Sequence, residues 1–243
     1  MRKHLILLTV ALCHSSILWA GWYNCRTYEG EVAGAKVHVY LQFFDKNGAS
    51  KDTIAVSGIY VYDKLNDPLV LKGNLIKSAV LELTEYHDGD AFAKLTLQWT
   101  ADSLTGTWQS SQKMHKVSLS QIGLLTDVDE AIVNPPTEIL MRDSFQSDYF
   151  LAVYYKGKDD TRARMSELRV IDKKTRIVKH VIKFDRDDWP VGNVSTDIFE
   201  SIRAWEPPRV DTRALEVEVD DGHMGQSYFM TYDPVQGKFV KAL

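Results

Sequence analysis

The chain has few cysteines, no excess of basic charge and no second long hydrophobic run. Its 243 residues include two cysteines, Cys13 and Cys25, too few for the disulfide framework of a small secreted domain. Acidic residues outnumber basic ones by 33 to 29, which argues against the basic stripe of a nucleic-acid-binding protein. No apolar run of membrane-spanning length follows the first residues. We therefore expect a soluble protein that is stabilised by its core and has no nucleic-acid partner.

Catalytic and metal-binding motifs are also missing. Gly225-Gln226-Ser227 begins a nucleophile-elbow string, but Phe229 stands where the second glycine is required. The histidines are scattered, without the H-E-x-x-H spacing of a zinc site. We therefore predict no catalytic residue, no metal site and no cofactor, and expect that the protein is not an enzyme. The alternative, a hydrolase with an unrecognised site, would need coupled carboxylates or an oriented nucleophile in a cleft.

The N-terminus has the three parts of a secretory signal. Arg2–His4 is positively charged, Leu5–Leu12 is apolar, and Ala20 is a small residue at the cleavage position. We assign residues 1–20 to a signal peptide cut between Ala20 and Gly21. The protein is then expected in the periplasm of a bacterium or secreted from it.

Two alternatives to cleavage have specific objections. A retained membrane anchor would be interrupted by His14, Ser15 and Ser16, whereas a spanning helix needs about 20 apolar residues. Lipidation at Cys13 would require a small residue before it, where Leu12 stands. Loss of the signal changes the formal net charge from −4 to −6 and leaves Cys25 as the one cysteine, without an intramolecular disulfide partner.

The first half of the mature chain, residues 21–125, alternates apolar and polar residues with a period of two. This pattern is typical of strands with one buried face, and turn-forming residues separate the segments. The segments are Lys36–Phe43, Thr53–Tyr62, Leu69–Leu75, Val80–Tyr86, Phe92–Trp99 and Leu104–Trp108. We predict a curved antiparallel meander that closes into a barrel-like domain.

Glycines in the middle of these strands support strong curvature. Gly30, Gly58, Gly73 and Gly106 are each followed two residues later by a large apolar or β-branched residue. Glycine inside a strand marks a bend, a bulge or a close approach of two backbones. Curvature is the interpretation we favour, and glycines lining a ligand cavity are the alternative.

A boundary and a second β-rich domain are predicted after the meander. Residues 126–137 lose the period-two pattern and contain Pro135 and Pro136, so we assign them to a linker, with the second domain at 138–243. The one helix candidate is Ser195–Arg203, capped by Ser195 or Thr196. The predicted strands are Tyr149–Lys156, Glu167–Asp172, Arg176–Phe184, Ala214–Val219, Gln226–Tyr232 and Lys238–Lys241.

Acidic and aromatic residues of the second domain are the candidate partner-binding site. Loops rich in carboxylates could bind calcium, but they lack the regular spacing of an EF-hand, so we favour solvated loops beside a protein-binding surface, where Trp and Tyr are enriched. The candidate residues are Asp187, Asp188, Trp189, Asp220, Asp221, Tyr228 and Tyr232.

Two strings in residues 145–243 resemble a known family. Leu168–Val178 (LRVIDKKTRIV) looks like the L-x-V-x-D-x-x-T hairpin of bacterial periplasmic inhibitor and immunity proteins related to inhibitors of invertebrate-type lysozymes. Ser227–Phe239 is similar to their closing strand pair, which ends Tyr-Asp-x-x-x-Gly-x-Phe. The family's plug loop, Ser-Gly-x-x-Tyr, is one residue longer than Ser57–Tyr60 of this chain.

The resemblance implies a protein that binds and neutralises a cell-wall-degrading enzyme, as a lysozyme inhibitor or an immunity protein. Lysozymes are commonly basic, so an acidic partner would gain from charge complementarity. The alternative is a periplasmic small-ligand or envelope-associated binding module. It would need an open apolar cavity in the first domain, lined by Val37, Tyr60, Leu75 and Trp99.

Overall fold

The computed structural model describes residues 24–44, 52–63, 67–100, 102–111, 113–126, 134–158, 163–185, 197–206, 213–220 and 225–241. The predicted signal peptide, residues 1–20, lies outside this part of the chain. The described residues form three antiparallel sheets and one three-residue 3-10 turn, which confirms the mainly-β prediction. No helix within these ranges is long and apolar enough to cross a membrane.

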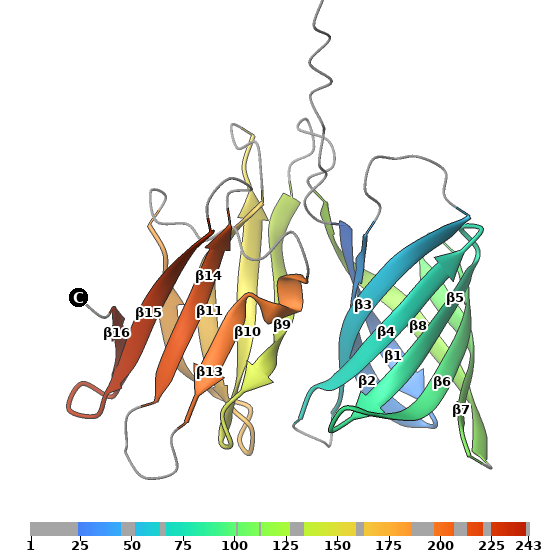
Figure 1. The fold of residues 1–243 in the computed structure, drawn as a ribbon, viewed down its shortest axis with the longest axis horizontal. Coiled ribbons are helices and arrows are strands. Elements are labelled where there is room, and N and C mark those ends of the chain that lie inside the picture. Colours follow the sequence, from blue (N-terminus) through green and yellow to red (C-terminus); the bar gives the residue numbers. More distant parts are fainter. Residues whose placement is uncertain are drawn as a thin grey trace, which may run out of the picture.

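Eight consecutive strands close into an antiparallel barrel, on the right in Figure 1. Each strand pairs with the next, and β8 returns to pair with β1, so that the barrel has no open edge. The predicted meander is therefore a closed barrel. Its strands are β1 (Asn24–Val32), β2 (Ala35–Phe43), β3 (Thr53–Tyr62), β4 (Leu69–Ile76), β5 (Val80–His87), β6 (Asp90–Trp99), β7 (Ser103–Ser110) and β8 (Lys113–Thr126).

Side chains fill the inside of the barrel. Val37, Tyr60 and Leu75 are buried in one apolar cluster, and Trp99 packs against it. An eight-stranded barrel is just wide enough for its own side chains to fill. These four residues, which would line the cavity of a small-ligand module, are thus part of a packed core.

The mid-strand glycines lie where neighbouring strands approach closely. A Cβ built on Gly30, Gly73 or Gly106 would lie 1.8–2.1 Å from a carbonyl oxygen of the adjacent strand. A Cβ on Gly58 would lie 2.6 Å from the carbonyl oxygen of Tyr40. No side chain larger than hydrogen fits at such distances, so these glycines allow the strands to coil tightly.

One carboxylate, Glu85 of β5, points into the barrel and is 1% exposed. One of its oxygens accepts a hydrogen bond from Trp108 Nε1 at 2.6 Å, and the other lies 2.5 Å from His87 Nε2. Burial, and then the nearby Glu85 charge, raises the pKa of Tyr60. The barrel core therefore contains a polar cluster at the end where β5 turns into β6.

The described residues from Asn134 onward form a sandwich of two four-stranded sheets, on the left in Figure 1. One sheet has the order β12-β11-β10-β9, and the other has the order β13-β14-β15-β16. Phe145 packs against both Phe150 and Phe239, with ring centroids 5.1 and 5.8 Å away, so the two sheets share one core. The strands are β9 (Asn134–Ser144), β10 (Asp148–Lys156), β11 (Arg164–Asp172), β12 (Val178–Lys183), β13 (Ile202–Trp205), β14 (Ala214–Asp220), β15 (Gly225–Asp233) and β16 (Lys238–Lys241).

The predicted helix over Ser195–Arg203 is wrong over residues 197–203, and its predicted caps, Ser195 and Thr196, lie outside the described residues. The chain makes a 3-10 turn, η2 (Ile198–Glu200), and then continues as strand β13. Asp197 caps the turn, since its carboxylate accepts a hydrogen bond from the Phe199 N–H at 2.9 Å. Pairing with β14 and burial of Ile198 in the core outweigh the weak helix signal.

The predicted linker overlaps a strand. β9 begins at Asn134, so Pro135 and Pro136 belong to the sheet and not to a loop. Proline lacks a backbone donor and is tolerated on edge strands, and β9 is the edge strand of its sheet. The sequence pattern reads this proline pair as a breaker because it does not show which strand will lie at an edge.

A buried polar joint fastens the barrel to the sandwich. The Ser57 hydroxyl of β3 donates to the Asp197 carboxylate, and the Ile198 N–H donates to Gln42 Oε1 at 2.7 Å. Cys25 and Leu125 of the barrel are buried in the sandwich core cluster. A disulfide from Cys25 to another chain would require this joint to open.

Replacing Asp197 by asparagine is expected to change stability in a pH-dependent way. Burial raises the pKa of Asp197 more than the hydrogen bonds from Ser57 and Phe199 lower it. The folded protein therefore holds this proton more tightly than the unfolded chain does. The resulting stability is fully present below the unfolded pKa of about 3.9 and is lost as the pH rises through the folded pKa.

Asparagine does not titrate, so the difference in free energy of unfolding, Asp197→Asn minus native protein, should rise as the pH increases above about 4. Urea unfolding at a series of pH values measures the difference. The exposed Asp102→Asn is the control. A difference that stays constant with pH, or falls as pH rises, would contradict this account of the joint.

Candidate functional site

Three of the seven predicted partner-binding residues, Asp220, Tyr228 and Tyr232, lie in the part of the chain that the structure describes. Asp187, Asp188, Trp189 and Asp221 lie outside the described residues. Asp220 is the last residue of β14. The side-chain surroundings are described for Tyr228 and Tyr232 but not for Asp220.

Tyr228 and Tyr232 are half-buried and pack against the sandwich core. Lys241 Nζ lies 4.4 Å from the ring centroid of Tyr228. The Tyr232 ring packs edge-on against Phe239 at 5.3 Å, and Arg213 lies 5.7 Å from its centroid. Both rings therefore contribute to packing rather than to an exposed tip.

The predicted hairpin at Asp172 is present and tightly held. The Asp172 carboxylate accepts hydrogen bonds from the N–H groups of Lys174 and Thr175 at 3.0 and 2.7 Å. Lys179 Nζ bridges this carboxylate and the buried Asp148 at 2.8 and 2.6 Å. Hydrogen bonds from Lys179 and Thr175 hold the pKa of Asp172 below its usual range. This network fixes the hairpin whose turn, at Arg176, borders a cleft between the barrel and the sandwich.

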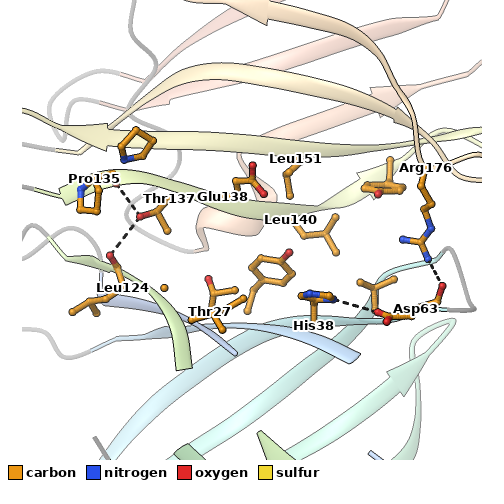
Figure 2. Close-up of a pocket in the computed structure, with 16 residues that line it drawn as sticks. Thr27, His38, Asp63, Leu124, Pro135, Thr137, Glu138, Leu140, Leu151 and Arg176 are labelled. Carbon is orange, nitrogen blue, oxygen red and sulfur yellow. Dashed lines mark hydrogen bonds and ion pairs between the residues drawn. The ribbon is translucent and has the colours of Figure 1, made fainter. Parts of the chain in front are cut away.

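A cleft of about 940 Å³ opens between the barrel wall and the outer face of the β9–β12 sheet (Figure 2). On the barrel side its lining comes from β1, β2, β3 and β8. On the sandwich side the lining comes from β9, β10 and the turn between β11 and β12. Among the candidates whose side chains the structure describes, Tyr228 and Tyr232 are not part of this lining.

Alternating residues of β2 form the barrel side of the cleft. Val39 points into the barrel core, whereas Tyr40 and His38 belong to the outer wall. The strand register places Tyr40 beside Thr27 of β1. His38 Nδ1 lies 3.3 Å from the Asp63 carboxylate, an ion pair whenever the histidine is protonated.

Apolar and charged residues share the sheet side of the cleft. Leu140 of β9 is paired with Leu151 of β10, and both lie against the barrel. Glu138, two residues before Leu140, forms an ion pair with Arg169. Tyr149 completes this side. The cleft thus has apolar walls and polar groups along its length.

Contacts across the cleft bridge both of its ends (Figure 2). At one end the Thr137 hydroxyl donates to the Pro135 carbonyl oxygen at 3.0 Å and lies 3.5 Å from the Leu124 carbonyl oxygen across the cleft. At the other end Arg176 Nη2 donates to the carbonyl oxygens of Asp63 and Tyr62 at 2.9 and 3.4 Å. These bridges, with the joint at Asp197, hold the two walls in fixed positions.

The strand register gives the distance between the two bridges. Leu124 is paired with Arg26 of β1, whereas Asp63 bonds to Lys36, whose partner on β1 is Glu31. Five residues of strand separate these positions, or roughly 17 Å at about 3.3 Å per residue. An extended chain of about five residues therefore fits along the cleft.

A β-bulge shapes the barrel side at Ile122. Thr27 is paired with Gly123 and Tyr28 with Gln121, so Ile122 is the extra residue of β8. Its side chain is 51% exposed and lines the cleft. Bulges re-aim side chains and are frequent next to functional sites. The bulge therefore supplies an accessible apolar contact in the cleft.

Two side chains with hydroxyl groups, Thr27 and Tyr40, line the barrel side of the cleft. Thr27 is 5% exposed, and its Oγ1 is buried without a hydrogen-bond partner among the described residues. Tyr40 is 8% exposed. Burial, followed by the charge of Glu138 and the neighbouring Tyr149, raises the pKa of Tyr40. Because buried polar groups are normally hydrogen-bonded, the unpaired Thr27 hydroxyl is an exception in this wall.

These groups are suited to binding. The cleft combines apolar contact, two phenols, a threonine hydroxyl and a histidine–carboxylate pair. In the described ranges no group of three His, Cys, Asp or Glu side chains is arranged to hold a metal ion. The chemistry that this cleft offers is recognition of a chain with apolar and polar contacts.

No pattern within one segment of the sequence indicates this site, because its residues come from both domains. Thr27 and Glu138 are more than 100 positions apart, and only the packing of the barrel on the sandwich brings them together. One local signal was present. Tyr40 is an aromatic residue in the polar row of β2 (His38, Tyr40 and Gln42), where a solvated face would not need one. Comparisons with protein-family models, curated proteins and solved structures find no match to this chain.

Proposed function

We propose that this chain is an exported, non-catalytic binding protein that holds an extended segment of a partner protein between its barrel and its sandwich. The observation that carries the proposal is the cleft, which is preformed, bridged at both ends and about five residues long. Rigid walls reduce the entropy lost on binding. A partner segment would therefore meet a site that is already in its binding shape.

The lining of the cleft favours a polypeptide over a compact small molecule. Tyr40, Tyr149 and Arg176 belong to the residue types that are enriched at protein interfaces. Leu140, Leu151 and Ile122 supply apolar contact beside them. Successive side chains of an extended segment point to opposite sides. They could therefore contact the polar and the apolar lining residues of an elongated site in turn.

The partner class rests on the sequence resemblance. Residues 145–243 resemble periplasmic inhibitor and immunity proteins, and on this basis we propose a cell-wall-degrading enzyme as the partner. The net negative charge of the chain is consistent with a basic enzyme, because complementary charge speeds association.

Glutamate in place of Ile122 should abolish partner binding without unfolding the protein. The side chain is half exposed, so the fold tolerates a charge, but a bound segment would bury that charge beside apolar residues. We expect affinity for the partner to fall at least about 100-fold, since burying an unpaired charge costs several kcal/mol. The measurement is capture of a panel of purified wall hydrolases, followed by a lysis assay with any hydrolase that is retained.

Met114→Glu is the matched control, because Met114 is an exposed apolar residue of the same strand, 67% exposed and outside the cleft. It should retain both capture and inhibition of lysis. Equal capture by the two variants would remove the cleft from the binding site. Retention of no wall hydrolase by the native protein would contradict the proposed partner class.

A further inference from the structure

Resting on the proposed function, we propose that the part of the cleft at Glu138 and Tyr40 selects a cationic side chain, lysine or arginine, of the bound segment. A carboxylate and a phenol converge there from opposite walls. Glu138 belongs to β9 of the sandwich, and Tyr40 belongs to β2 of the barrel.

The Glu138 carboxylate keeps acceptor capacity for a ligand. Its side chain is 53% exposed, and Arg169 donates to Oε1 alone. Arg169 is shared, because Glu167 Oε1 accepts from it as well, at 2.5 Å from Nη2. One guanidinium thus serves two carboxylates, and this triad carries a net negative charge. The hydrogen bond and the ion pair from Arg169 both involve Oε1 of Glu138, which leaves Oε2 for a ligand.

Tyr40 adds a second acceptor and an aromatic wall. Its hydroxyl lies close enough to Glu138 for the carboxylate charge to raise its pKa, after the larger effect of burial. Phenol oxygens accept hydrogen bonds from ammonium and guanidinium groups. The ring lies beside Thr27, where the methylene stem of a lysine or arginine could pack while its charged head reaches Glu138.

The other charged side chains along the cleft also favour a cationic group. Glu29 and Asp63 flank His38 at the end of the barrel wall, with their carboxylates 3.9 and 3.3 Å from the ring. Of the carboxylates, Asp63 and Glu138 line the cleft itself. One arginine, Arg176 of the end bridge, lines it as well.

Arg176 is already engaged. Its guanidinium bonds the Asp63 carbonyl oxygen and lies 5.7 Å from the centroid of the Tyr149 ring. With neutral histidine, Asp63 and Glu138 against Arg176 give the lining of the cleft an excess of one negative charge. A cationic group would gain from this field, and an anionic group would be repelled.

The test is selection of heptapeptides from a random display library on the purified protein, repeated on Ile122→Glu. We expect peptides that bind the native protein, fail on Ile122→Glu and share a lysine or arginine at one position. Glu138→Gln, a nearly isosteric change, should weaken a selected peptide about tenfold. Replacing the shared lysine by norleucine should weaken it equally, with no further loss when both changes are combined. Glu82→Gln, an exposed carboxylate on the barrel, should change nothing.

The possible failures are distinguishable. Peptides that depend on position 122 but share no cationic position would overturn the cationic selectivity and leave the proposed function in place. Additive losses in the double-change measurement would also overturn it, since the lysine would then act elsewhere. If no peptide depends on position 122, the cleft function fails together with this inference.

Discussion

Replacing Gly73 by alanine should destabilise the barrel by at least about 3 kcal/mol, at the upper end of what overpacking costs. A Cβ at this position would lie 1.8 Å from the carbonyl oxygen of Glu82 and 2.9 Å from Leu83 Cα. Both atoms belong to the backbone of a paired strand, so neither can move without breaking the ladder between β4 and β5. Urea unfolding followed by tryptophan fluorescence measures the loss as a lower midpoint.

Gly123→Ala is the control for the Gly73 experiment. Gly123 is also a barrel-strand glycine, but its nearest neighbour would be the Thr27 side chain at 3.4 Å, an ordinary contact. The free energy of unfolding of Gly123→Ala should stay within about 0.5 kcal/mol of that of the native protein. Equal losses of stability at the two positions would contradict this account, because they would mean that the loss of any strand glycine, and not the close approach of β4 and β5, destabilises the barrel.

Truncating Glu85 to alanine should cost roughly 3 kcal/mol. The carboxylate accepts from Trp108 Nε1 at 2.6 Å and contacts His87 at 2.5 Å. The variant leaves the buried indole N–H of Trp108 without its acceptor, and it opens a small cavity. The measurement is again urea unfolding. The NMR chemical shift of the Trp108 indole N–H is a second readout, and it should move to the value of an N–H group without a hydrogen bond.

Glu82→Ala, at an exposed position on the same strand, should remain within about 0.5 kcal/mol of native stability. Glu85→Gln keeps one oxygen acceptor and should lose less than Glu85→Ala. A Glu85→Ala protein as stable as Glu82→Ala would show that the polar cluster inside the barrel contributes nothing to folding.

The strands of the barrel can be predicted from the alternation of apolar and polar residues, and the curvature that closes the barrel can be predicted from its mid-strand glycines. Alternation predicts six of its strands closely, and Thr53–Tyr62 matches β3 at both ends. The glycines at 30, 73 and 106 already suggested close strand approach. By contrast, Glu85 continues the inward row of Leu81 and Leu83, and the sequence alone does not name the Trp108 donor that makes a carboxylate acceptable there.

The second domain was harder to predict because its strands depend on long-range pairing. β13 (Ile202–Trp205) has four residues and is defined by its ladder with β14, so its sequence resembled the end of a helix. β9 contains Pro135 and Pro136, which only an edge position tolerates. The cleft depends on both domains at once, and no spacing within one strand could have indicated it.

The most direct test of the cleft as a binding site is photo-crosslinking from position 122 in living cells. A photoreactive phenylalanine analogue at Ile122 should crosslink to one cell-wall-degrading enzyme, and the same analogue at Met114 should not. Crosslinks of equal yield from both positions, or none from position 122 to any wall hydrolase, would contradict the account.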